Sequence, residues 1–121
     1  KMNPFVSHGI VVLIWGLWHL PYIRYITSYT TESLVTLVPR FVLGAIAASM
    51  VYGEIRLKTN SVWPAWLMHT VGATVVTAFM LYGGMTFSSD TEWLFHPVFE
   101  GSLTIVFFIA VGIILYRLRR K

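Results

Sequence analysis

Two histidines lie in stretches of the sequence that are otherwise apolar, and their side chains are the best suited to chemistry. His19 follows a segment rich in tryptophan, and His69 lies within the run SVWPAWLMHTVGATVVTAFM. An imidazole can move protons near neutral pH, ligate a metal, or donate a hydrogen bond to a developing oxyanion. Because an ionisable group in hydrocarbon is costly unless it faces the protein interior, the pair indicates a functional site inside a membrane protein.

The composition supports a membrane protein. Of the 121 residues, 56% are hydrophobic and only 12% are charged, whereas soluble domains have roughly 25% charged residues. Four stretches have the roughly 17 to 25 residues that cross a bilayer, at about 4–26, 35–55, 62–83 and 98–116. They are continuously apolar rather than alternating, which predicts helices. We therefore expect an all-α polytopic membrane protein, with residues 1–121 forming one bundle of about four transmembrane helices.

The distribution of charge predicts an orientation. Placing the basic C-terminal residues 117–121 in the cytoplasm also places Lys1, Arg56 and Lys58 there, and it leaves only Arg24 and Arg40 outside. This is the distribution that the positive-inside rule favours, so we expect a cytoplasmic C-terminus in contact with lipid headgroups. No recognition motif accompanies the basic residues, which argues against nucleic acid as a partner. The absence of cysteine excludes disulfides, thiol nucleophiles and thiolate metal sites.

The first apolar stretch collects polar groups on one face. We expect a helix that begins near Asn3 and breaks or kinks near Pro21. On a helix, His8, Trp15 and His19 fall within about 40° of one another. This stripe is open to three interpretations: a catalytic face, an interfacial tryptophan with a histidine bonded to a carbonyl, or the path of a proton or metal transporter.

Small residues dominate the neighbouring stretches. Gly44 and Ala48 form a small-xxx-small pair, which is typical of close helix packing. In the third stretch we expect Ser61 to cap the helix that carries His69, with Ala73 four residues later on the same face. At 1.5 Å per residue, His19 and His69 differ in depth by roughly 10 Å, which helix tilt must close.

Peptide hydrolysis needs an activated water, a group that moves protons, and donors for the tetrahedral oxygen. His19 and His69 can supply two of these functions, but a carboxylate that activates water is missing. Glu54 and Glu100 are the nearest candidates, and both lie at the ends of apolar stretches. His96 lies four residues before Glu100, and we interpret it as solvated or lightly paired rather than catalytic.

Two segments resemble motifs of a protease family. WGLWHLP, at residues 15–21, resembles the motif FxxxH, with Trp15 in place of phenylalanine and His19 as the histidine. SVWPAWLMHTVGA, at residues 61–73, resembles a motif in which histidine is followed four residues later by Asn or Asp, and here His69 is followed by Ala73. These are motifs of the CPBP family of intramembrane proteases, also called the Abi or type II CAAX prenyl endopeptidase family. The resemblance covers roughly residues 10–73.

The resemblance implies an intramembrane endopeptidase. In that family, the glutamate of a Glu-Glu-xxx-Arg motif and the FxxxH histidine activate water, which assigns this role to His19. The second histidine and its Asn bind the oxyanion, which assigns His69 to that role, with Thr70 or Thr74 as donors in place of Ala73. Some members have been described as metalloproteases, so a divalent metal such as zinc on the two histidines is an open alternative. Members cleave prenylated CAAX proteins, or in bacteria serve bacteriocin maturation and self-immunity, which implies a membrane-associated protein or peptide substrate and a bacterial plasma membrane.

Two departures from the family pattern shape the remaining hypotheses. Residues 1–121 hold no Glu-Glu pair, so we expect a C-terminal part of a longer chain that is inactive alone. Ala73 in place of Asn or Asp indicates altered or lost catalysis. The alternative to a protease is therefore a non-catalytic immunity or scaffold protein of the same fold, and the second alternative is the histidine-based transporter.

Overall fold

The chain is almost entirely helical. The computed structural model describes residues 3–26, 32–86, 88–96 and 100–121. Its helices are α1 (Pro4–Ile26), α2 (Leu34–Thr59), α3 (Trp63–Leu81), α4 (Glu92–Phe95) and α5 (Ser102–Arg120), and the described residues contain no strand. The all-α expectation is confirmed, because the apolar stretches are too continuous for a sheet with one solvated face.

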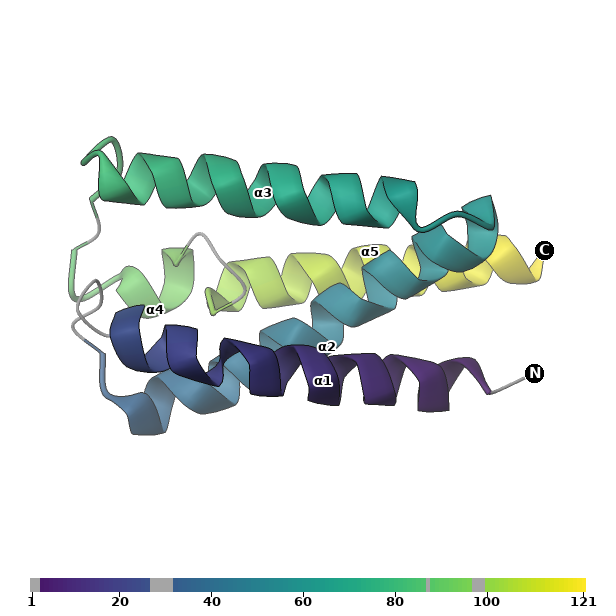
Figure 1. Ribbon diagram of the computed structural model, residues 1–121, viewed down its shortest axis with the longest axis horizontal. Coiled ribbons are helices and arrows are strands. Elements are labelled where there is room, and N and C mark those ends of the chain that lie inside the picture. The colour runs from purple at the N-terminus through teal and green to yellow at the C-terminus, as the bar shows by residue number, and fades with distance from the viewer. Residues whose placement is uncertain (1–2, 27–31, 87, 97–99) are drawn as a thin grey trace.

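The four long helices run along one another and α2 holds them together (Figure 1). α2 packs most extensively on α5, and it also contacts α1 and α3. Its packing face includes Gly44, Ala45 and Ala48, all of which are buried. Gly112 of α5 lies close to α2 as well, since a Cβ atom there would lie 3.2 Å from Cβ of Met50 and 3.7 Å from Cγ2 of Val51. The small residues therefore allow the close helix approach that their spacing predicted.

Helices α2 and α5 are long and apolar enough to cross a membrane, among the described residues. α1 contributes a shorter apolar segment, Val6–His19. With 23 and 19 residues, α1 and α3 extend over about 34 and 28 Å, and both lie alongside the other two (Figure 1). The expectation of four membrane spans rests on this arrangement and remains a prediction for α1 and α3.

Two helix ends differ from the sequence-based expectations. α1 continues through Pro21 to Ile26 instead of ending at the proline. Membrane helices tolerate an internal proline because neighbouring groups satisfy the freed carbonyl, here that of Leu17. At the start of α3 the N-cap position is Val62 rather than the expected Ser61, although Oγ of Ser61 accepts a hydrogen bond of 3.3 Å from the backbone N–H of Trp63, the first residue of α3.

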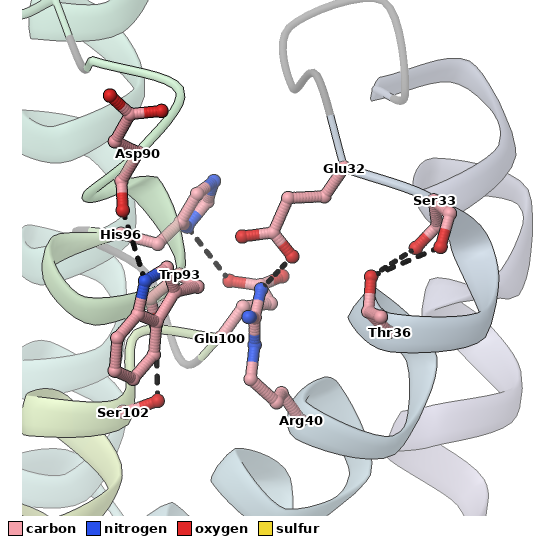
Figure 2. A network of polar contacts seen from close by, with 9 residues as sticks. All are labelled: Glu32, Ser33, Thr36, Arg40, Asp90, Trp93, His96, Glu100 and Ser102. Carbon is pink, nitrogen blue, oxygen red and sulfur yellow. Dashed lines mark hydrogen bonds and ion pairs between the residues drawn. The ribbon is translucent and has the colours of Figure 1, made fainter.

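Two polar side-chain pairs, one partly buried and one buried, lie at the end of the bundle opposite the chain termini (Figure 2). Arg40 of α2 pairs with Glu32, and His96 Nδ1 lies 3.3 Å from Oε2 of Glu100. Only 4% of the surface of His96 is exposed. The predicted pairing of His96 is therefore confirmed, whereas the expected solvation is wrong because α4 and the start of α5 enclose the ring.

Candidate functional site

The indole of Trp15 brings the two motif histidines together. Its ring centroid lies 4.2 Å from that of His19 and 5.7 Å from that of His69. His19 stands one turn after Trp15 on α1, whereas His69 projects from α3. The two imidazoles are close enough to interact electrostatically. Both imidazoles therefore lie beside the same indole, although they come from two different helices.

Phe41 and Tyr52 complete the aromatic surroundings from α2. Phe41 stacks on Trp15 with ring centroids 5.8 Å apart and an interplanar angle of 10°. Tyr52 meets His69 edge to face, with centroids 5.9 Å apart. The sequence analysis did not single out these two residues, because no local motif distinguishes them from the other aromatic residues of the apolar stretches.

The hydrogen bond of His19 determines which of its nitrogens is basic. Nδ1 lies 2.7 Å from the backbone carbonyl oxygen of Trp15. Because a carbonyl only accepts, Nδ1–H must be the donor, and Nε2 of the neutral ring then carries the lone pair. The structural interpretation of His19, a histidine bonded to a carbonyl, is thus correct for Nδ1. The same bond orients Nε2 as a proton acceptor, so the two interpretations are compatible.

A cavity of about 420 Å³ lies against this pair, between α1, α2 and α3. Pockets for small ligands measure about 300 to 1,000 Å³, so the cavity is large enough for part of a peptide or lipid chain. Trp15 and His69 form part of its wall, while His19 packs behind the indole. Most other lining residues are apolar or small, and they include Val11, Val12, Ala45, Ala48, Leu57 and Ala65. His8 also lines the cavity. Two of the three residues of the predicted stripe, His8 and Trp15, therefore form part of its wall.

The oxyanion motif is incomplete at its second position. Ala73 lies four residues after His69 on α3 and is exposed, and its methyl group cannot donate a hydrogen bond. Thr70 is half-buried and Thr74 is exposed. One residue turns an α-helix by about 100°, so Thr70 stands on a different face from His69. The substitution of Ala73 for Asn or Asp is therefore a real chemical difference within the motif.

The two carboxylates that the sequence offered as water activators are engaged elsewhere. Glu54 accepts hydrogen bonds from Nε and Nη2 of Arg119, at 2.6 and 3.1 Å. Glu100 pairs with His96 at the opposite end of the bundle. The remaining carboxylates of the chain are Glu32, which pairs with Arg40, and Asp90 and Glu92, which lie at or before α4. Neither Glu54 nor Glu100 is therefore suited to act beside His19.

A resident zinc ion does not fit the residues at this site. A catalytic zinc takes three protein ligands, from histidine, cysteine or carboxylate. The described part of the chain contains no group of three such side chains that could hold a metal. His19 and His69 would provide two of the three ligands, so the described residues do not form a complete zinc site by themselves.

Comparison with known proteins agrees with the motifs. A family model described as type II CAAX prenyl endopeptidase Rce1-like matches residues 1–75. The match includes α1, α2 and the part of α3 that carries His69. No curated protein and no solved structure gives a significant match.

Proposed function

We propose, from the premise that this chain belongs to the Rce1-like family of type II CAAX prenyl endopeptidases, that it provides the histidine half of an intramembrane endopeptidase site. The observation that carries the proposal is the convergence of His19 and His69 on one indole beside a cavity. The protein is an integral membrane protein by its family and its apolar helices.

In the proposed reaction, a water molecule is activated between a glutamate and the Nε2 atom of His19. The water oxygen attacks the carbonyl carbon of the scissile peptide bond, and the carbonyl oxygen becomes an oxyanion. An N–H of His69 donates a hydrogen bond to this oxyanion, which stabilises the charge where it develops. Nε2 of His19 takes a proton from the water as it attacks. The oxyanion then reforms the carbonyl group while the C–N bond breaks, and His19 gives this proton to the leaving amine.

The glutamate must come from outside residues 1–121 in this proposal. All five Asp and Glu residues of the chain lie in the described parts. Of these, Glu54 near the end of α2 is paired with Arg119, and Glu100 before α5 is paired with His96. We therefore expect residues 1–121 alone to bind substrate without cleaving it, and a chain that also supplies the Glu-Glu-xxx-Arg motif to be active.

The proposed substrate is a protein or peptide associated with the membrane, such as a prenylated chain. The cavity lies between three helices that carry large exposed apolar side chains, among them Leu13 and Ile14 of α1 and Leu67 of α3. A substrate can therefore reach it from the lipid phase without crossing a polar surface. The basic residues at the end with both chain termini favour a cytoplasmic position for that end.

A non-catalytic scaffold or immunity protein of the same fold is the second candidate, and Ala73 is the observation that favours it. Loss of one oxyanion donor lowers kcat by about 10²- to 10³-fold in other enzymes. Such a protein would keep the cavity, the Trp15 contacts and ligand binding, but it would not cleave.

The test is cleavage of a farnesylated CAAX peptide by a longer chain that combines residues 1–121 with a Glu-Glu-xxx-Arg segment. His19→Ala and His69→Ala are compared with Trp18→Phe and Met68→Leu, which alter exposed neighbours on the same two helices. Cleavage that both histidine variants lose and both controls retain supports the protease. Binding without cleavage by the unmodified protein supports the scaffold.

A further inference from the structure

A third histidine, His8, lines the cavity and has no role in the proposed reaction. It lies seven residues before Trp15 on α1, which corresponds to about 10 Å along the helix axis. Ser7 and Arg56 also line the cavity, and they lie near the start of α1 and near the end of α2. These two helix ends lie at the end of the bundle that holds the chain termini (Figure 1). The cavity therefore has a polar end that lies apart from the histidine pair at Trp15.

The imidazole of His8 occupies the space where residue 53 of α2 would otherwise carry a side chain. A Cβ atom built on Gly53 would lie 2.8 Å from Nε2 and 2.5 Å from Nδ1 of this ring. Non-bonded heavy atoms normally approach to about 3.5 to 4.0 Å. Any residue larger than glycine at position 53 must therefore displace the ring, so Gly53 forms a notch that holds it.

The notch is fixed by a third helix. Gly53 directly precedes Glu54, whose carboxylate is bonded to Arg119 of α5. Glu54 is buried, with 4% of its surface exposed. Both charges of this ion pair act electrostatically on His8. The ring is thus held between α1 and α2 at a point where α5 anchors α2, which argues for a defined position on the cavity wall.

We propose that His8 contacts the ligand of this cavity, and that Gly53 places it there. A neutral or protonated imidazole always carries at least one N–H, so His8 donates a hydrogen bond to a carbonyl or carboxylate oxygen of a peptide, away from the bond that is cut. This inference rests on the proposed function for the identity of the ligand. Because the contact is distant from the reacting atoms, it contributes to binding in the ground state and in the transition state alike.

The test measures binding of a fluorescent farnesylated CAAX peptide to residues 1–121 in detergent micelles. His8→Ala and Gly53→Ala are each expected to raise the Kd by about two- to tenfold, the effect of losing one hydrogen bond. The Kd of the double variant is expected to be no higher than the higher of the two single-variant Kd values, because both changes remove the same contact. Gly9→Ala is the matched control, since a Cβ atom at this neighbour of His8 would meet no other atom within 4 Å.

Placement of the ring is tested without a ligand, from the spectra of protein labelled with ¹³C-histidine. The chain has four histidines, and Gly53→Ala should shift the resonance of His8 while leaving that of His96 in place. An unshifted His8 resonance overturns the inference, and so does a Gly53→Ala effect on binding that His8→Ala does not reproduce. Absence of peptide binding to the unmodified chain overturns it as well. Binding that depends on His8 without cleavage by the longer chain refutes only the proposed protease function.

Discussion

Arg119, the next-to-last residue of α5, donates two hydrogen bonds to the carboxylate of Glu54, near the end of α2. The glutamate is buried, whereas 29% of the arginine side chain is exposed. This ion pair joins the last helix to the central one at the end of the bundle where the cavity is polar. It also excludes Glu54 from water activation, because both of its oxygens accept from the guanidinium.

The first prediction concerns the different effects of replacing each partner of this ion pair. Arg119→Ala should lower the thermal stability of the protein more than Glu54→Gln does. The arginine variant leaves a buried carboxylate without its partner, whereas the glutamine variant removes the buried charge and keeps a similar volume. Thermal unfolding in detergent, followed by circular dichroism, measures both variants. Equal or reversed effects would show that the pair does not hold α5 on α2.

Periodicity and apolar length predicted the helices, because a chain in lipid must satisfy its backbone hydrogen bonds within each segment. The small residues Gly44 and Ala48 correctly indicated the packing face of α2. The break expected near Pro21 does not occur, since α1 continues to Ile26, whereas a kink at this residue stays a prediction.

The site was predictable only in part. The FxxxH-like and SVWPAWLMH segments identified His19 and His69, because each motif is local in sequence. The contact that joins them, through Trp15, depends on how α1 and α3 cross α2, and this is a property of tertiary packing. The notch at Gly53 was missed for the same reason: nothing adjacent to Gly53 in the sequence indicates that His8 lies over it.

The second prediction concerns Trp15. Trp15→Phe should keep most of the activity of the longer protein, because a smaller aromatic ring still packs on His19 and Phe41 and the family motif has phenylalanine at this place. Trp15→Ala should lower kcat by about 100-fold, since misplaced catalytic groups cost rates of this order. Steady-state cleavage of the peptide measures both variants. Equal activity of the two would mean that the ring does not position the histidines.

The third prediction concerns Ala73. Ala73→Asn should raise kcat by about 10²- to 10³-fold, because the amide would add the oxyanion donor that the motif otherwise supplies from this position. Ala73→Leu, whose side chain branches at the same atom as that of asparagine and has no donor, is the control and should give no gain. The same cleavage assay measures both variants, and a gain in the leucine variant would attribute the effect to packing rather than to hydrogen bonding.

The most direct test of the account is a double-variant cycle of cleavage rates for His19→Ala, His69→Ala and the combined variant in the longer protein. Each single change should lower kcat by about 10²- to 10⁴-fold. The combined change should cost far less than the product of the two, because residues that act as one catalytic unit are strongly non-additive. If the decrease in kcat of the combined variant equals the product of the two single decreases, or if either single variant keeps its kcat, the two histidines do not act together in one site beside Trp15.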